Sequence, residues 1–229
     1  MLCLISGMTV SGQTINWIKQ ISGNQYDYIK GMTTDASGNI YVVGGFSGTI
    51  NFGGSQATAQ GSDIWFGKYT SAGALVWAHG IGGGDDDFGM DIALDNSGNV
   101  YITGYFNGQS PAPDFDPSSG TANPTVSNGF FIAKYNNSGS FQWLRTIGGT
   151  SVSERAFGIA VDGSSNVYVS GTLLASSSTN INFNPGMLYS VKNAKSIIHI
   201  PVANYPEGQY YLQVVNKDGV KREQILIKR

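Results

Sequence analysis

A phrase of 14 residues occurs three times in this 229-residue chain and constrains its fold more than any other feature. The copies are TTDASGNIYVVGGF at 33–46, ALDNSGNVYITGYF at 93–106 and AVDGSSNVYVSGTL at 160–173. Each copy has an aspartate and small turn residues, followed by the β-branched and aromatic residues that favour strands. Repetition at this period indicates one supersecondary unit that is copied and stacked along the chain.

The repeat extends beyond this phrase. Trp17, Trp77 and Trp143 precede the three copies, and the segment 64–77 matches 131–143, whereas the third copy lacks this second half. Each full unit reads as two hairpins, and four antiparallel strands in about 60 residues make one propeller blade. The predicted fold is therefore all-β: an incomplete or small β-propeller of about three four-stranded antiparallel blades, with a small C-terminal β-sheet segment.

We expect the blades at about 31–80, 90–147 and 158–191, with an isolated outer strand at 14–21. Closed propellers have about four to eight blades, so three blades leave open edges that favour self-association. In a closed ring, 14–21 would complete the last blade. That closure would be partial unless a tail strand such as 209–216 replaces the missing third strand.

The repeated residues also carry a family resemblance. An aspartate, small polar residues, Gly-Asn and then Val/Ile-Tyr-Val/Ile-Thr-Gly resemble the SBBP beta-propeller repeat of secreted bacterial proteins. NFGG at 51–54, DFDPSSGT at 114–121 and NFNPG at 182–186 are similar to the linkers between the two hairpins of such repeats. The resemblance covers about 14–191. It implies a propeller scaffold, and a scaffold by itself implies no catalytic activity.

The last 38 residues differ in composition from the rest. Residues 1–191 hold 12 acidic and 6 basic side chains, whereas 192–229 hold 3 acidic and 7 basic ones, which indicates a module boundary near 190. Apolar and polar residues alternate at 196–202, 209–216 and 220–229, so we expect a small three-stranded sheet.

This tail resembles the last part of the type A sorting domain of the type IX secretion system. Gly208, Tyr210, Leu212 and Val214 match its Gly-x-Tyr-x-Leu/Val run, and the chain ends on a basic pair. The first strands of a full sorting domain are missing, so 192–229 is expected to be a partial domain. The resemblance implies the type IX machinery as a partner, and a location outside a Gram-negative bacterium, secreted or at its outer surface.

Residues 1–13 are mildly apolar and lack a basic start, so we interpret them as a truncated signal-like segment. The sequence contains no run of about 20 apolar residues, so it predicts no transmembrane helix. The single cysteine, Cys3, permits no internal disulfide.

The sequence assigns no catalytic, cofactor-binding or metal-binding residue. His79 and His199 have no zinc-motif spacing, and they lie in different modules. Asp85, Asp86 and Asp87 are the best calcium candidates, because calcium prefers clustered carboxylate and carbonyl oxygens. The alternative is an ordinary solvated loop. Asp114 and Asp116 are weaker ligand candidates that are equally suited to capping turns, and the repeated Asp35, Asp95 and Asp162 are expected to build turns.

Two functions fit these observations. The first is a non-catalytic secreted or cell-surface scaffold that binds a glycan or a protein. The acidic repeat region disfavours nucleic acid, because it repels phosphate. The alternative is an extracellular hydrolase or lyase that uses acidic residues at the propeller mouth. Catalytic carboxylates should break the repeat pattern, whereas the repeated aspartates follow it.

Overall fold

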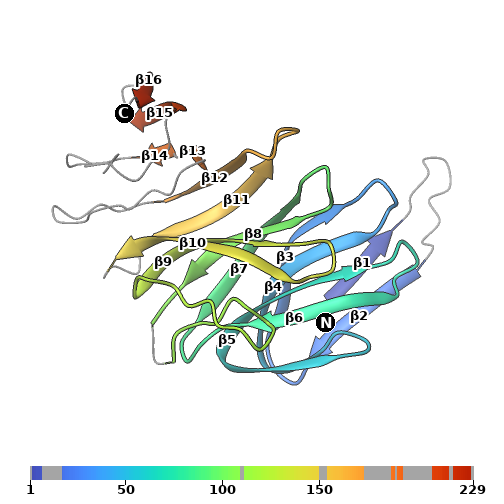
Figure 1. Ribbon diagram of the computed structural model, residues 1–229. Coiled ribbons are helices and arrows are strands. Elements are labelled where there is room, and N and C mark those ends of the chain that lie inside the picture. Colours follow the sequence, from blue (N-terminus) through green and yellow to red (C-terminus); the bar gives the residue numbers. More distant parts are fainter. Residues whose placement is uncertain are drawn as a thin grey trace.

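The computed structural model describes residues 2–6, 17–108, 111–149, 154–172, 187–188, 190–192, 208–216 and 219–227, and all regular elements among them are strands (Figure 1). Two complete blades follow each other along the chain. The first consists of β3 (Asp27–Thr34), β4 (Ile40–Asn51), β5 (Gln56–Tyr69) and β6 (Leu75–Ile81). The second consists of β7 (Asp87–Leu94), β8 (Val100–Phe106), β9 (Asn128–Tyr135) and β10 (Phe141–Gly149).

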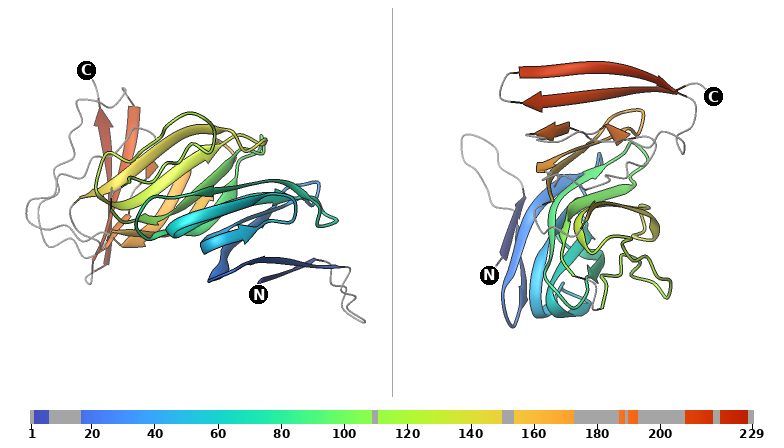
Figure 2. Two further views of the ribbon diagram at one scale, coloured as in Figure 1. Left: turned by 90° about the horizontal axis from the view of Figure 1, so that it is seen from below. Right: turned by 90° about the vertical axis from the view of Figure 1, so that its left-hand side faces the viewer.

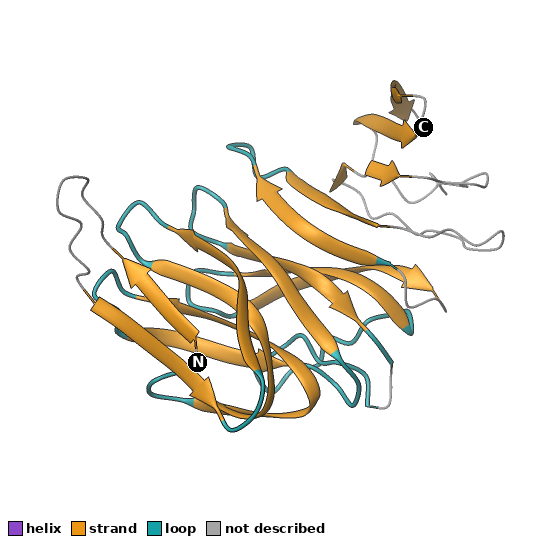
Figure 3. Ribbon diagram, turned by 180° about the vertical axis from the view of Figure 1, so that it is seen from behind, coloured by secondary structure: helices purple, strands orange, loops and turns teal. Residues whose placement is uncertain are grey.

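Both blades are antiparallel meanders in which each strand pairs with its sequence neighbour. The third blade has two strands of this kind, β11 (Arg155–Val161) and β12 (Val167–Thr172). Seen from behind, the blades stand side by side as separate sheets (Figure 3). The all-β fold and the incomplete propeller predicted from the sequence are thereby confirmed.

The inner hairpin of every blade contains the same irregularity. The register shifts between Ile29 and Gly31 in the first blade, and at the equivalent places in β7 and β11. Gly44, Gly104 and Gly171 lie opposite this bulge, where a Cβ atom would collide with the carbonyl oxygen of the residue across the hairpin. Glycine is therefore required at this repeated position because the two backbones approach so closely.

The core lies between neighbouring blades, and its largest members are aromatic. Phe66 of the first blade packs on Tyr135 of the second, with ring centroids 4.4 Å apart. Tyr69 and Tyr135 are fully buried at equivalent positions, and each donates its hydroxyl to a carbonyl oxygen of the linker in its own blade, at Phe52 and Phe115. Stacking of identical units therefore buries these side chains without leaving their hydroxyls unpaired.

A hydrogen-bonded contact joins the outer parts of the first two blades. The β9–β10 turn places Asn137 against the first blade. Its side-chain oxygen accepts hydrogen bonds from Tyr41 (3.0 Å) and Lys68 (2.5 Å), and its main-chain oxygen accepts one from the Trp77 indole (3.1 Å). The Trp77 ring also covers Gly139 in this turn. We call this set of contacts the Trp77–Asn137 contact.

β2 (Trp17–Gly23) repeats this arrangement one blade earlier. The Trp17 indole donates to the carbonyl oxygen of Ser71 at 2.9 Å, and its ring covers Gly73, as Trp77 covers Gly139. Ser22 of β2 pairs with Asn51, as Gly82 after β6 pairs with Asp114. β2 therefore occupies the place relative to the first blade that β6 occupies relative to the second.

The pairing of β2 differs from ring closure within one chain. β2 pairs with β1 (Leu2–Ser6) and with the end of β4, and within the described part of the chain it pairs with no strand of the third blade. The expectation that 14–21 completes the last blade of the same chain is therefore not met. The reason is geometric, because β2 is held on the first blade, and the second blade lies between it and the third.

The tail contains β13 (Met187–Leu188), β14 (Ser190–Lys192), β15 (Gly208–Asn216) and β16 (Gly219–Ile227). β15 and β16 form an antiparallel hairpin, drawn in red in Figure 2, and β14 pairs with β15 in parallel. Two of the three predicted tail strands thus correspond to described strands. The predicted strand at 196–202 lies outside the described residues.

We predict that Asn137→Ala lowers the free energy of unfolding by about 1–2 kcal/mol, because the Lys68 ammonium loses its acceptor and the Tyr41 hydroxyl keeps only Asp35. Ser71→Ala is the matched control. Ser71 occupies the equivalent turn position, but it uses only its main-chain oxygen in the contact with Trp17. Denaturant unfolding of both variants measures the difference, and equal midpoints would contradict the prediction.

Candidate functional site

The repeated aspartates build turns, as the sequence predicts. In each repeat, one carboxylate oxygen of Asp35, Asp95 or Asp162 accepts the amide hydrogens of the second and fourth following residues at 2.9 Å. The other oxygen accepts hydrogen bonds from the following asparagine and tyrosine. Four hydrogen bonds to one carboxylate lower the pKa of all three groups. These carboxylates therefore hold hairpins and are occupied by their own loops.

Asp114 and Asp116 also cap turns. Asp114 accepts the amide hydrogens of Asp116 and Ala122, and Asp116 accepts that of Ser118. Both carboxylates therefore organise the linker that carries Phe115 into the core.

The three consecutive aspartates at 85–87 have different surroundings. Asp85 and Asp86 are exposed, and Asp86 accepts the amide hydrogen of Ser62 at 3.1 Å. Asp87 is fully buried at the start of β7 and accepts the amide hydrogens of Gly83 and Asn107. Within the described residues, no group of three or more Asp, Glu, His or Cys side chains is arranged to hold a metal ion. The predicted calcium candidates therefore do not come together as one ligand set.

Asp87 belongs to a buried position that the sequence analysis missed. Asp27, Asp87 and Glu154 occupy the same place at the start of the first hairpin of each blade, where Asp87 and Glu154 are buried and Asp27 is half-buried. Asp27 accepts the amide hydrogen of Gly23 as Asp87 accepts that of Gly83, so the acid holds the chain where it crosses between blades. A comparison of the residues eight positions before each turn aspartate would have revealed this position.

A second buried carboxylate, Asp63 of β5, is coupled to Asp87. Burial raises the pKa of Asp87 to about 8, and the charges of Asp63 and Asp85 add to this. Burial raises the pKa of Asp63 to about 6, with a smaller contribution from Asp86. One oxygen of Asp63 is buried without a hydrogen-bond partner in the described structure. The first two blades therefore contribute one carboxyl group each, Asp63 of β5 and Asp87 of β7, that hold protons more tightly than ordinary ones.

We predict that Asp87→Asn changes how stability depends on pH. The pKa of Asp87 is raised from 3.8 to about 8 by folding, so its contribution to stability is complete below about pH 4 and is lost as the pH rises towards 8. The variant should therefore gain stability relative to the wild type across this window, with a limiting slope of about 1.4 kcal/mol per pH unit.

Unfolding curves measured between pH 4 and pH 9 test this prediction. Asp85→Asn should change this pH dependence much less than Asp87→Asn, because the exposed Asp85 charge is only the smallest of the causes that raise the pKa of Asp87. A constant difference in stability between Asp87→Asn and the wild type at all pH values would contradict the assignment.

The histidines show no catalytic arrangement. His79 stacks on Trp77 with ring centroids 5.5 Å apart, and burial lowers its pKa. Its Nε2 atom is buried without a hydrogen-bond partner in the described part of the chain. His199 lies outside the described residues. His79 therefore functions as a packing residue beside the Trp77–Asn137 contact.

A row of aromatic and basic side chains crosses the ends of the inner hairpins. Its members come from the loop before β3, from β3, β7 and β8, and from β11; the row consists of Tyr26, Tyr28, Lys30, Phe88, Tyr105 and Arg155. The strands β3, β7 and β11 that carry most of them pack against one another in sequence order (Figure 1). We call this set the aromatic row.

The aromatic row is connected by ring contacts. The rings of Tyr26 and Tyr28 are 5.6 Å apart, and the Lys30 ammonium lies 5.5 Å from the Tyr28 ring. Phe88 stacks on Tyr105 at 4.6 Å, and the Arg155 guanidinium of the third blade lies 4.6 Å from the Tyr105 ring. The contacts form two groups, one within the first blade and one that joins the second blade to Arg155 of the third.

The two halves of the aromatic row lie close together. Burial is the largest cause that raises the pKa of Tyr28 above its ordinary value, and the nearby Tyr105, Tyr26 and Asp86 add to it. The strands β3 and β7 that carry Tyr28 and Phe88 pack against each other, so the two halves of the row are adjacent.

The aromatic row is where the repeats differ most clearly. Tyr28, Phe88 and Arg155 occupy equivalent positions, directly after the buried acid of each blade. Their partners across the hairpin are Gly45, Tyr105 and Thr172. Residues that only pack identical units against each other have no reason to vary in this way. The row, with Tyr26 71% exposed, is therefore the candidate binding surface.

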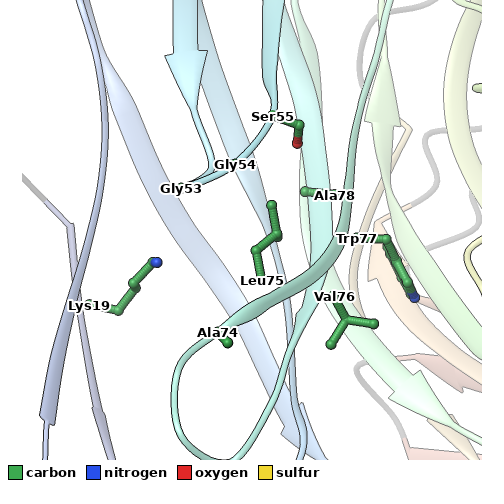
Figure 4. Close-up of a pocket in the computed structure, with 9 residues that line it drawn as sticks. All are labelled: Lys19, Gly53, Gly54, Ser55, Ala74, Leu75, Val76, Trp77 and Ala78. Carbon is green, nitrogen blue, oxygen red and sulfur yellow. The ribbon is translucent and has the colours of Figure 1, made fainter.

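A separate open groove of about 610 Å³ lies between β2 and β6 (Figure 4). It is lined by Lys19, Gly53, Gly54, Ser55, Ala74, Leu75, Val76, Trp77 and Ala78. Lys19 and Ser55 supply the polar side-chain groups, since the Trp77 indole is engaged by Asn137. The groove follows from the placement of β2 beside the first blade, and it lacks the convergent polar groups that orient a ligand.

Comparison with known proteins agrees with the fold. Residues 16–44 and 71–109 match the family model of the SBBP beta-propeller repeat. The chain thus contains two segments that match a beta-propeller repeat, and together they span less than half of its length. Each match covers an outer strand and part or all of the inner hairpin of the next blade, β2 to β4 and β6 to β8. The comparison therefore treats β2 and β6 as equivalent, as the hydrogen bonds do.

Two curated relatives share sequence with the chain. One is an uncharacterized WD repeat-containing protein of Acanthamoeba polyphaga mimivirus, 30% identical over 166 residues, which are 64% of this chain and 12% of the relative. The other is the regulatory protein FlaEY of Caulobacter vibrioides, 24% identical over 147 residues, or 62% of this chain and 15% of the relative. The chain therefore spans only a small part of either relative. Within the described residues, no helix is long and apolar enough to span a membrane.

Proposed function

We propose that this chain is a non-catalytic binding scaffold that acts outside the cell, and that the aromatic row binds an oligosaccharide. The row carries the proposal because it combines the exposed Tyr26 and half-buried aromatic rings with flanking charges, and because it departs from the repeat. Flat aromatic faces pack against apolar faces of a ligand, while Lys30, Arg155 and Asp86 supply hydrogen-bonding groups. The beta-propeller repeats supply the rigid support for such a surface.

The size of the row favours a small ligand over a protein. A stable protein interface uses about 20–30 residues on each side and buries about 800 Å² per partner. The aromatic row has six members and a few polar neighbours, which is closer to the contact set of a short glycan. A protein ligand is the alternative outcome of the test below.

The buried carboxylates do not favour the enzyme alternative. Raised pKa values are common at catalytic sites, and Asp63 and Asp87 have them. However, Asp87 is 0% exposed and Asp63 is 7% exposed, and Asp87 is engaged by backbone amides. A substrate has no access to these groups without opening the junction between the blades. Asp63 and Asp87 instead hold the junction between the first two blades.

We expect the wild-type chain to bind members of a glycan array of neutral and acidic oligosaccharides, and Tyr26→Ala and Arg155→Ala to weaken that binding at least tenfold. Tyr26 is 71% exposed, so its loss should leave the fold intact. Met32→Ala is the control, since Met32 is 54% exposed on the same strand as Tyr28 but lies outside the row. Unchanged glycan affinity in both row variants would contradict the proposal. If the wild-type chain instead binds a protein that both row variants fail to bind, the ligand of the row is a protein and the glycan proposal is wrong.

The export proposal rests on the tail. Gly208, Tyr210, Leu212 and Val214, which resemble the sorting motif, stand at alternate positions of β15. We propose that residues 192–229 direct the chain through type IX secretion to the medium or the outer surface of a Gram-negative bacterium. The propeller part would then be the cargo.

Deletion of 192–229 should retain the protein in the periplasm of a host with a type IX system and a supplied signal peptide. Fusion of 192–229 to an unrelated periplasmic reporter should export the reporter. Cell fractionation and immunoblotting measure both outcomes. Export of the truncated chain at the wild-type level would contradict this role.

A further inference from the structure

Two incomplete blades lie at opposite ends of the described repeats. At one end, β1 and β2 form an antiparallel pair in which β2 holds the position of an outer strand. At the other end, β11 and β12 form the inner hairpin of the third blade. A full blade of this protein contains one pair of each kind, as β3–β6 and β7–β10 show. The two ends are therefore complementary halves of one blade.

The third blade is open on the side where an outer pair belongs. In the second blade, β8 pairs with β9 along all seven of its residues. In the described structure, the corresponding edge of β12 pairs only at Val167 and Tyr168, with the two-residue parallel strand β13. Val169, Ser170 and Gly171 of β12 pair with no described strand on that edge. Such an edge favours the addition of another strand.

Side-chain burial shows the same gap. In the first blade, Tyr41 is 0% exposed because Lys68 of the third strand lies over its ring and Trp77 packs on its edge. In the second blade, Tyr101 is 2% exposed because Lys134 and Trp143 cover it in the same way. Tyr168, at the equivalent position of the third blade, is 38% exposed. An outer strand pair would bury this ring as it buries the other two.

The face of the second blade that should meet a complete third blade lacks one kind of contact. Lys134 lies 3.6 Å from Asp95, and the Tyr101 hydroxyl donates to the same aspartate. In the first blade, the equivalent Lys68 reaches across to Asn137, and the Tyr41 hydroxyl is shared between Asp35 and Asn137. Within the described residues, no turn meets Tyr101, Lys134 and Trp143 in this way. The contact that joins the first and second blades thus has an empty counterpart one blade further on.

We propose that two copies of this chain complete each other's third blade: β1 of one copy pairs antiparallel with β12 of the other, and β2 becomes the outermost strand. β1 has five residues and β12 has six, and the second edge of β1 has no strand partner in the described structure. The short parallel strand β13 gives way to this longer pairing.

The count of blades explains why a second copy is the partner. One chain contributes an outer pair, two full blades and an inner pair, which together equal three blades. A ring of three is smaller than the range of about four to eight blades in which propellers close, whereas two copies give six. The arrangement is a closed two-fold dimer, so it leaves no open edge. It also follows the observed pairing, because β2 of each copy stays on its own first blade.

The first test is the mass of the wild-type 229-residue chain in solution, measured by light scattering after size-exclusion chromatography over a hundredfold range of concentration. The expected result is a single species with twice the mass of one chain at the higher concentrations. A monomer throughout, or a series of larger open assemblies, would overturn the proposal. This measurement uses no variant, so misfolding of a mutant does not affect it.

The second test uses the native Cys3, which lies in β1 and is the only cysteine of the chain. Val169→Cys and Ser170→Cys place a second cysteine on one or the other face of β12. Mild oxidation should then yield a covalent dimer in at least one of them, because cross-strand neighbours lie within disulfide reach. Adding Cys3→Ser should abolish the covalent dimer.

The control for accidental cross-linking is Val76→Cys, which places a cysteine on β6 where the side chain is 49% exposed. It should remain monomeric on denaturing gels after the same oxidation. A disulfide within one chain between β1 and β12, detected by mass spectrometry, would show closure in the monomer and overturn the proposal. Equal cross-linking of all three cysteine variants would also overturn it.

Discussion

The contact between a tryptophan of one blade and the glycine-containing turn of the next is the interaction on which the rest of this structure depends. Trp77 donates to Asn137 and covers Gly139, and Trp17 makes the same contacts with Ser71 and Gly73. Each contact fixes the rotation of one blade relative to the next. The aromatic core behind it, including Phe66 and Tyr135, forms only when that rotation is correct.

The inner hairpins of the first two blades are each held by hydrogen bonds to two carboxylates. One aspartate per repeat receives the hydrogen bonds that close the turn, while a buried acid at the start of the hairpin holds the crossover from the preceding blade. The pKa of the first group is lowered even at Asp95, which is buried, whereas burial raises the pKa of Asp87. Two carboxylates of the same strand pair therefore have pKa values that are shifted in opposite directions. One accepts many hydrogen bonds, whereas the other is shielded from water.

Much of the fold was predictable because the repeat is regular. Aspartate, glycine and tyrosine at fixed spacing predicted the hairpins, and the matching segments 64–77 and 131–143 predicted the outer strands. The buried acids were missed because an aspartate next to other aspartates in a glycine-rich stretch reads as a solvated loop. The aromatic row was also missed, since Tyr26, Phe88 and Arg155 share no residue type and meet only when three blades stand side by side.

The sequence by itself determined the unit: two hairpins, their turns and bulges, and the order in which the blades follow. These features depend on residues close together in the chain, so a local pattern is sufficient to specify them. Only the tertiary structure decided where β2 docks, which aspartates are buried, and which side chains from different blades form one surface. Those outcomes depend on how each blade rotates against its neighbour, and that rotation is fixed by contacts between residues 54 and 60 positions apart.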